Sequence, residues 1–374
     1  MPAKPRPPAE TAPLPLYRAR IKRLRAHLDN SGVASLLITN PLDIRYLSPF
    51  CGDDSYALLT DSQFWIISDS RFTEDLIPAH PLATVIMRKG DMVAAVKDLV
   101  SSARPRTVGI QADYLTIAAR SKLAAALGPR KLKDTSGLLS SLRIVKDDFE
   151  IAAIRHAVSI QEAALKATLK TLRAGQTESA IAARLEFEMK TRGSPKPSFD
   201  TIVAAGPNSS KPHAVPGSAK LARGGVLLID WGATHGGYHS DMTRTFALGK
   251  WPAKLAEAYK VVLEAHNAAL AAVAPGKTGE QLDAVARNII IKAGYGDQFG
   301  HGLGHGIGLN IHEDPRLNRY GSANILRPGM VVTIEPGIYL PGLGGIRIED
   351  DALVTKRGGE GLCTLPKDLR WATI

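Results

Sequence analysis

The chain is poor in cysteine: among its 374 residues there are two, Cys51 and Cys363. Such a count excludes the disulfide framework of a small secreted domain, and we expect a reducing, cytoplasmic location. Uninterrupted apolar runs of about 18 residues are also missing, so no membrane-spanning helix is expected. The N-terminal stretch MPAKPRPPAETAPLPL contains six prolines and no apolar run. We therefore expect no signal peptide and a disordered, proline-rich tail over residues 1–15.

Clusters of basic charge are absent as well. The net charge of +11 is of a size that can indicate a nucleic-acid-binding surface. The excess is spread along the chain, because Lys and Arg outnumber Asp and Glu by 21 to 16 through residue 150 and by 26 to 20 afterwards. No basic run is interleaved with aromatic residues. We therefore expect a generally basic surface, with no nucleic-acid partner and no membrane partner.

The rest of the composition is that of a globular protein, and the length of the chain suits two domains. Hydrophobic residues make up 44% and charged residues 22%, which is ordinary for a chain with a sizeable core. At about 150 residues per domain, the length predicts two domains. Residues 16–140 alternate strand-like runs (VASLLITN, FWIISD, ATVIM) with helical patterns, one of which should end at Gly32. A long helix opens the second domain, 141–374, where Asp147 and Glu150 form a capping pair.

The second domain contains one pattern twice. The segments from Gly175 to Gly193 and from Gly276 to Gly294 share a Gly-x-Thr start, an amphipathic stripe and a glycine stop, with the same interval of 18. A long helical segment precedes each copy, and a strand-rich segment with frequent glycines follows it. Chance similarity could explain two amphipathic helices alone, but the matching order of the whole units favours internal duplication. Two related halves would place corresponding strands around a shared cleft.

Four acids stand in strand-like runs of this domain. Asp230 ends VLLID, Asp241 follows a Gly-Gly turn, Glu335 lies in VVTIE and Glu349 lies in GGIRIED. A carboxylate among Leu, Ile and Val is costly to keep ionised, and each half supplies two of them. If all four converged, their charges would repel and raise their pKa values. Two divalent cations would cancel four negative charges, and with a neutral imidazole the ligand set suits manganese, cobalt or zinc.

The stretch FGHGLGHGIGLNIHEDP holds three histidines, His301, His305 and His312. His301 and His305 have the i, i+4 spacing of a helical zinc pair. Five glycines between Gly300 and Gly308 exclude a helix, since each costs about 1 kcal/mol there. The segment is better explained as a tight strand or turn whose backbone lies close to another. One histidine should bind metal, and the pattern alone leaves open which one, although His305 is central.

Several motifs resemble those of a known family. In chain order, LLIDWGA, HSDMTRTF, GHGIGLNIHEDP, TIEPGIY and GGIRIEDD resemble the metal-ligand motifs of the creatinase/aminopeptidase ("pita-bread") superfamily, and within it the proline-specific aminopeptidase P and prolidase. FDTIVAAGPNSSKPHAVPG, from Phe199, resembles the segment with that family's substrate-side histidine, and NPLDIRYLSPFCGDDSYALLT, from Asn40, resembles its N-terminal domain. The resemblance implies an α/β (α+β) fold: a creatinase-like α/β domain over 16–140 and a pita-bread metallopeptidase domain over 141–374 with an internal pseudo-twofold duplication.

The resemblance also implies a dinuclear metal centre. Its ligands would be Asp230, Asp241, His305, Glu335 and Glu349. Asp241 and Glu349 would bridge both ions. Asp230 would bind one ion, and His305 with Glu335 would bind the other. Manganese is the first choice for the two divalent cations, with cobalt or zinc as alternatives.

The resemblance also implies roles for further residues. His213 and His312 would face the substrate, and Arg347 would orient a ligand carboxylate. His301 is expected to be structural or to support a ligand. His239 occupies a position that varies in the family, so we do not expect it to be a ligand.

The implied activity is hydrolysis of the bond before proline. A hydroxide bridging the two metals would attack the scissile carbonyl, and Glu335 would pass the proton to the departing nitrogen. The first expectation is an Xaa-Pro aminopeptidase, acting as a homodimer on Xaa-Pro peptides. The alternative is an Xaa-Pro dipeptidase (prolidase), which cuts only dipeptides. Nothing in the sequence separates the two, because loops and neighbouring subunits decide whether longer peptides are excluded.

Three other activities fit the sequence less well. Methionine aminopeptidases resemble the second domain alone, and creatinase does not keep the metal ligands. Non-catalytic binding modules on the same fold typically lose ligands, whereas this chain has all five.

Overall fold

The computed structural model describes residues 10–320 and 325–374. The expected tail, residues 1–15, therefore lies largely outside the described residues, and helix α1 (Leu14–Ser31) begins within its last part. The chain divides into two compact units, Thr11–Arg143 and Ile144–Ile374. Over the described ranges, no helix combines the length and apolar character needed to cross a membrane.

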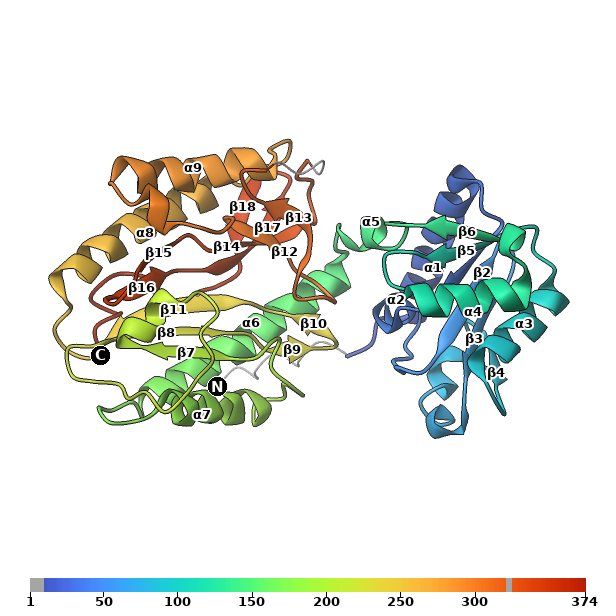
Figure 1. The fold of residues 1–374 in the computed structure, drawn as a ribbon, viewed down its shortest axis with the longest axis horizontal. Coiled ribbons are helices and arrows are strands. Elements are labelled where there is room, and N and C mark those ends of the chain that lie inside the picture. Colours follow the sequence, from blue (N-terminus) through green and yellow to red (C-terminus); the bar gives the residue numbers. More distant parts are fainter. Residues whose placement is uncertain (1–9, 321–324) are drawn as a thin grey trace, which may run out of the picture. The chain divides into compact units, whose positions relative to one another are not determined.

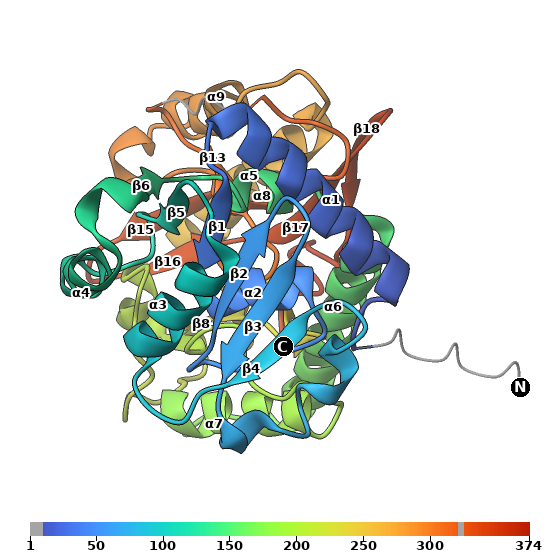
Figure 2. The same cartoon turned by 90° about the vertical axis from the view of Figure 1, so that its right-hand side faces the viewer.

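The Thr11–Arg143 unit is built on one six-stranded sheet, in the order β4-β3-β2-β1-β5-β6 (Figure 2). The strands that VASLLITN, FWIISD and ATVIM predict are confirmed as β1, β3 and β4. β1 pairs antiparallel with β2 and parallel with β5, so the sheet is mixed. The strands are β1 (Ser35–Ile38), β2 (Tyr56–Thr60), β3 (Phe64–Ser68), β4 (Thr84–Met87), β5 (Val108–Gln111) and β6 (Leu132–Thr135).

Helices connect several of these strands and pack against the sheet. Helix α1 ends as predicted at Gly32, which has φ 63°, a left-handed conformation that glycine adopts readily. Leu37 and Leu58 of the sheet form one core cluster with Val96 and Leu123 from two of the helices. The remaining helices are α2 (Pro41–Leu47), α3 (Met92–Ala103), α4 (Ile117–Leu127) and α5 (Ser140–Arg143), with short 3-10 turns η1 (Ser70–Phe72), η2 (Ile77–Ala79) and η3 (Pro129–Lys131).

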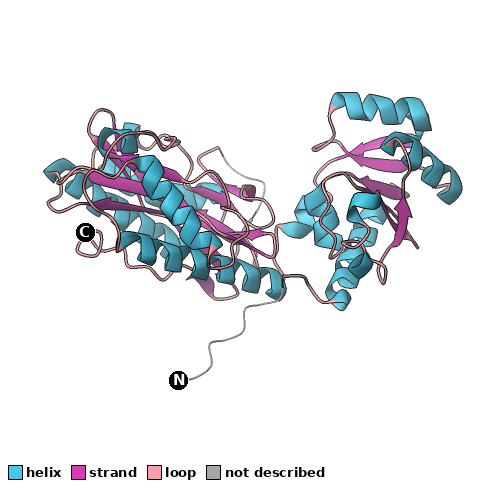
Figure 3. Cartoon of the chain, turned by 90° about the horizontal axis from the view of Figure 1, so that it is seen from below, coloured by secondary structure: helices cyan, strands magenta, loops and turns pink. Residues whose placement is uncertain are grey.

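The Ile144–Ile374 unit shows the predicted duplication in its element order. Its first half runs α6 (Asp148–Leu169), α7 (Glu178–Lys190), β7 (Ile202–Ala205), β8 (Val226–Trp231) and β11 (Met242–Ala247). Its second half repeats this order with α8 (Ala253–Ala272), α9 (Gly279–Lys292), β12 (Gly304–Gly306), β14 (Val331–Ile334) and β17 (Asp350–Thr355). In Figure 1 the strands lie between α8 and α9 on one side and α7 on the other, and Figure 3 shows helices along the outside of the strands.

Each half contributes its own sheet. The first has the order β11-β8-β7 and the second has the order β13-β12-β14-β17-β18. The added elements are η4 (Gly206–Ser210), the hairpin β9 (Thr234–His235) and β10 (Tyr238–His239), η5 (Gly296–Gln298), β13 (Glu313–Leu317), the hairpin β15 (Gly337–Leu340) and β16 (Gly344–Arg347), and β18 (Gly358–Gly361).

Matching local contacts support the duplication. Thr177 and Thr278 cap the first turns of α7 and α9. Just before them, Gly175 and Gly276 have φ values of 88° and 86°, which favour glycine. Their N–H groups each donate to a leucine carbonyl shortly before the equivalent strands β8 and β14, at 2.8 and 2.9 Å. The capping box that Asp147 and Glu150 predict at the start of α6 is confirmed.

Candidate active site

The Ile144–Ile374 unit contains a cavity of about 650 Å³. Its wall includes every side chain that the sequence analysis assigned to the site. These residues are His213, Asp230, Asp241, His305, His312, Glu335, Arg347 and Glu349. Segments far apart in the sequence therefore meet in one pocket.

The four acids occupy corresponding places in the two halves. Asp230 lies near the end of β8, and Glu335 directly follows the equivalent strand β14. Asp241 directly precedes β11, and Glu349 directly precedes the equivalent strand β17. Each half thus presents one acid where a central strand ends and one where the neighbouring strand begins, so the pseudo-twofold arrangement brings all four together.

His305 lies at the centre of the short strand β12, where the glycines permit close packing. A Cβ added to Gly304 would overlap the carbonyl oxygen of Thr333, and one added to Gly306 would overlap that of Asp314. The expectation of a non-helical segment with closely packed backbone is confirmed. The close approach places His305 beside the acids.

The ligand atoms of this cluster are within reach of a common ion. Nε2 of His305 lies 3.7 Å from Oδ2 of Asp241 and 3.6 Å from Oε1 of Glu335. One ligand atom from each of Asp241, His305 and Glu349 lies within 4.8 Å of the others. Nδ1 of His305 lies 3.0 Å from the Gly306 carbonyl oxygen. In the neutral imidazole with its proton on Nδ1, that hydrogen bond leaves the Nε2 lone pair directed at the carboxylates.

Burial and like charge disfavour ionised carboxylates here. Burial, together with the charges of Glu349 and Asp230, raises the pKa of Asp241 well above its usual value. Burial raises the pKa of Glu349 in the same way, with contributions from Glu335 and Asp230. Burial raises the pKa of Glu335 to about 8, and burial lowers the pKa of His305 to about 3. A neutral imidazole among acids whose charges repel one another is an arrangement that bound cations would stabilise.

Arg347 compensates part of the negative charge. Its Nη2 donates to Oδ2 of Asp230 at 2.6 Å, and its Nε donates to the hydroxyl oxygen of Thr243 at 2.9 Å. The Thr243 hydroxyl in turn donates to Oε2 of Glu349 at 2.6 Å. One arginine therefore orients an acid from the first half directly and an acid from the second half through a threonine.

Among the described residues, two carboxylate oxygens of the four acids are left without a hydrogen bond. They are Oδ1 of Asp230 and Oδ1 of Asp241, and both are buried. Buried polar atoms without partners are rare. Oxygen donors with a neutral imidazole nitrogen are a ligand set for manganese, cobalt or zinc. The donor set therefore fits divalent cations.

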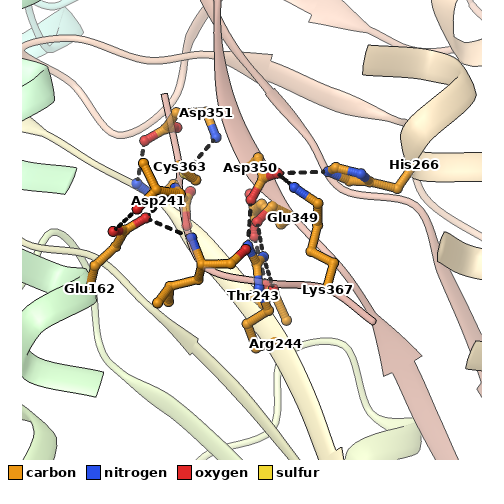
Figure 4. Close-up of polar contacts among 12 residues, drawn as sticks. Glu162, Asp241, Thr243, Arg244, His266, Glu349, Asp350, Asp351, Cys363 and Lys367 are labelled. Atoms are coloured by element: carbon orange, nitrogen blue, oxygen red, sulfur yellow. Dashed lines mark hydrogen bonds and ion pairs between the residues drawn. The ribbon is translucent and has the colours of Figure 1, made fainter. Parts of the chain in front are cut away.

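A buried polar network supports the two acids that precede β11 and β17 (Figure 4). Arg244, fully buried, donates to the Glu349 carbonyl oxygen at 2.6 Å and to Oδ1 of Asp350 at 2.7 Å. Asp350 also forms an ion pair with Lys367. On the other side, the Asp351 carboxylate accepts the Asp241 N–H at 3.0 Å. The backbone of both acids is thus held by charged side chains within the unit.

The remaining histidines differ in where they lie relative to the cavity and the proposed ligands. The His312 ring packs edge-on against His305, with centroids 4.4 Å apart, while His213 reaches the cavity from an exposed loop. His301 also lines the cavity, and its Nε2 lies 2.9 Å from the Tyr339 hydroxyl oxygen. Within the described residues, His239 does not belong to the cluster of candidate metal ligands.

Three residues of the site were not predicted from the sequence. Tyr339 accepts a hydrogen bond from Nη1 of Arg347 at 2.8 Å, and Thr243 links Arg347 to an acid. Arg316 is exposed, lines the cavity and pairs with His305 across β12 and β13. A lone Tyr, Thr or Arg in a strand carries no local signal of function, because the same residues are common on ordinary sheet surfaces. The only available signal was the alternation of side chains between the two faces of the strand EDPRL, which could have suggested the face of the sheet on which Arg316 lies.

Comparisons with known proteins agree with this geometry. The family described as metallopeptidase family M24 matches residues 152–356. The family described as creatinase/prolidase N-terminal domain matches residues 20–145. The M24 match lies within the Ile144–Ile374 unit, and the N-terminal match lies within the Thr11–Arg143 unit except for its last two residues.

Whole-chain relatives cover almost the full length. An Xaa-Pro dipeptidase from Pyrococcus furiosus is 35% identical over 94% of this chain and 99% of its own length. The solved structure of an Xaa-Pro dipeptidase from Bacillus anthracis is 37% identical, with a TM-score of 0.92 over 96% of this chain and 100% of its own. That of an X-Pro aminopeptidase from Thermotoga maritima is 36% identical, with a TM-score of 0.87 over 95% of this chain and 100% of its own.

Proposed function

This chain belongs to metallopeptidase family M24, and we propose that it is an Xaa-Pro dipeptidase that hydrolyses the bond before a C-terminal proline. The observation that carries the proposal is the convergence of four acids and His305 in one cavity that also contains a cationic side chain, Arg316. The acids and the imidazole suit metal-assisted hydrolysis. The cation suits the free carboxylate of a dipeptide.

We propose that the cavity holds two divalent cations, manganese by first choice. The residues that would hold them are Asp230, Asp241, His305, Glu335 and Glu349. When bound, such ions acidify an attacking water molecule and polarise the scissile carbonyl. Two ions would balance the charge of the four acids, of which Asp241 and Glu349 have pKa values raised by burial and by the neighbouring carboxylates.

The chain's own residues then position the substrate and move a proton. Glu335 would take the proton of the attacking water on a carboxylate oxygen and return it to the proline nitrogen as the bond breaks. His213 and His312 would orient the scissile carbonyl and the adjoining residue. The scissile nitrogen before proline carries no hydrogen, so the site must recognise carbonyl groups and ring shape rather than an N–H.

The choice between dipeptidase and aminopeptidase differs from the first expectation. The first expectation from the sequence is an Xaa-Pro aminopeptidase, whereas two of the three relatives described above are named Xaa-Pro dipeptidases. Arg316 favours the same order, because it lies across the strand pair from His305 and so near the proposed ligands. A dipeptide has its carboxylate one residue beyond the scissile bond, where a longer peptide has an uncharged amide. Aminopeptidase activity remains the second candidate, favoured by the Thermotoga maritima relative.

The test compares Ala-Pro with Ala-Pro-amide, which has the same size but no terminal charge. We expect the wild type to prefer Ala-Pro by about 10- to 100-fold in kcat/KM, the range that one charge-assisted hydrogen bond supplies. The variant Arg316→Gln should lose this preference, mainly through a higher KM for Ala-Pro, while its activity on the amide stays close to that of the wild type.

A second comparison uses the tripeptide Arg-Pro-Pro. Efficient cleavage of Arg-Pro-Pro, with no preference for Ala-Pro over its amide, would support the aminopeptidase instead. No hydrolysis of any Xaa-Pro substrate by protein loaded with manganese, cobalt or zinc would contradict both. Metal analysis of the purified protein tests the number of ions independently of activity.

Two further parts of the proposal concern the protein as a whole. We propose a homodimer, which light scattering on the purified protein would test. A cytoplasmic location is proposed with it, and fractionation of the source cells would test that part.

A further inference from the structure

We propose that Glu178 is a positioning residue for His213, a role that rests on the proposed function of His213 as a substrate contact. Glu178 is the first residue of α7 and is 1% exposed. His213 lies in the loop that joins β7 to β8. Glu178 does not line the cavity, whose wall includes His213.

The Glu178 carboxylate joins the two ends of one segment of that loop, residues 205–217. Oε1 accepts the N–H of Ala205, the last residue of β7, at 2.7 Å, and an N–H of the Asn208 side chain at 3.0 Å. Oε2 accepts the N–H of Gly217 at 3.0 Å. His213 lies between these attachment points. Three hydrogen bonds to one buried carboxylate therefore close the 205–217 segment of the loop at its base.

The middle of the loop is attached to a different element. The Ser209 hydroxyl accepts the N–H of Gly345 in β16 at 2.8 Å. The carbonyl oxygen of Pro212 lies 3.4 Å from Nη1 of Arg347. With its base held by Glu178 and its middle held by β16, the loop has a defined course into the cavity. A catalytic side chain on a loop needs this support, because a misplacement of about 1 Å can cost about 100-fold in rate.

Capping of α7 does not account for Glu178. An acid in the first turn of a helix is favourable, but the Thr177 side chain already caps this turn. The Glu178 oxygens are used by the loop instead. The other half supports this distinction, because α9 begins with Gly279 after its own capping threonine. A Cβ at Gly279 would overlap the Arg316 carbonyl oxygen. The duplicated helix therefore forms without an acid at this position, and the acid is present only in the half that carries His213.

The test is a double-mutant cycle between Glu178→Gln and His213→Ala. Glutamine keeps the shape but replaces one acceptor oxygen with a donor, which then faces the N–H groups of the loop. In the wild-type background we expect Glu178→Gln to lower kcat/KM for Ala-Pro by roughly 10- to 100-fold without changing metal content. In the His213→Ala background the same change should cost less than about two-fold. Hydrogen exchange of peptides covering residues 205–217 should become faster in Glu178→Gln.

The matched control is Glu162→Gln. Glu162 is a buried helical acid that likewise holds a loop, through Thr364 and the N–H of Leu365. Its effect on kcat/KM should be the same with and without His213. If the effect of Glu178→Gln is also the same in both backgrounds, Glu178 is structural and the inference is wrong. If Glu178→Gln does not fold, Ser179→Ala is the milder variant, because its hydroxyl donates to the Gly217 carbonyl oxygen at 2.8 Å.

The experiment separates this inference from the proposed function. Full activity of His213→Ala on Ala-Pro would refute the substrate role of His213 and with it the positioning role. An active-site role for His213 with unchanged exchange of residues 205–217 in Glu178→Gln would refute the inference alone.

Discussion

At the scale of single residues, the acidic side chains of the site are buried next to one another, which makes their ionisation unfavourable. Asp241 and Glu349 are buried next to other acids, and burial raises the pKa of each well above its usual value. Among the residues that the structure describes, only one arginine forms an ion pair with any of the four acids of the site. This pair joins Arg347 to Asp230. Cations bound between the acids would make their ionisation more favourable, so metal binding and ionisation of the site should be coupled.

Replacing the two acids that precede β11 and β17 should remove the metals. Asp241→Asn and Glu349→Gln each delete a charge from a proposed metal ligand. We expect loss of metal binding and a loss of turnover larger than the roughly 10- to 100-fold that follows removal of a supporting partner. His312→Ala should keep both metals and lose about 100-fold or more in kcat/KM. Metal analysis and Ala-Pro kinetics on the same samples would test this, and metal loss in His312→Ala would reassign it as a ligand.

Among the elements, the short strand β12 sets the distance between His305 and the acids. Its flanking glycines let it lie against β13 on one side and β14 on the other. A Cβ on Gly304 would overlap the Thr333 carbonyl oxygen, whereas a Cβ on Gly300, in the same segment, meets nothing within 4 Å. The segment is therefore sensitive to an added Cβ at Gly304 and insensitive to one at Gly300.

Gly304→Ala should push β12 away from β14 and move His305 relative to Glu335. We expect a loss of about 1–3 kcal/mol in the free energy of unfolding, which is typical of overpacking, together with weaker metal binding. Gly300→Ala should leave both unchanged. Thermal unfolding and metal titration of the two variants provide the comparison. Equal behaviour of the two would mean that the backbone at Gly304 adjusts without displacing His305.

For the whole Ile144–Ile374 unit, a buried charged network connects helix α8, both halves and the C-terminal segment. Nε2 of His266 lies 3.4 Å from Oδ2 of Asp350, which also pairs with Arg244 and Lys367. Burial lowers the pKa of His266 to about 4, from an ordinary value of 6.5. Between these pH values the unfolded chain binds a proton at this position and the folded chain does not. Stability should therefore fall as the pH drops through this interval.

His266→Gln should make that loss shallower. Without the histidine, the difference in bound protons between the unfolded and folded chain falls by up to one. The pH dependence of the free energy of unfolding should therefore decrease by at most about 1.4 kcal/mol per pH unit. Denaturant unfolding of both proteins from pH 7.5 to 4 measures the two slopes. The metal ligands are common to both proteins, so their titration cancels in the comparison. Parallel curves below pH 6.5 would show that His266 is not the proton-binding group responsible.

The sequence by itself determined which residues could do chemistry. Acids inside apolar strands are costly unless paired, so Asp230, Asp241, Glu335 and Glu349 stood out, and alternating glycines excluded a helix around His305. The duplicated Gly-x-Thr pattern predicted two related halves. The resemblance to known motifs was needed to separate His305 from its neighbouring histidines.

Tertiary structure alone decided which residues meet. Strand periodicity tells on which face a side chain lies, but the opposite wall of the cavity comes from the other half of the domain. Tyr339, Arg316 and Glu178 therefore gave no local signal, because their importance lies in contacts with distant segments. The packing of two separate sheets sets those distances, and no property of a short stretch of sequence specifies them.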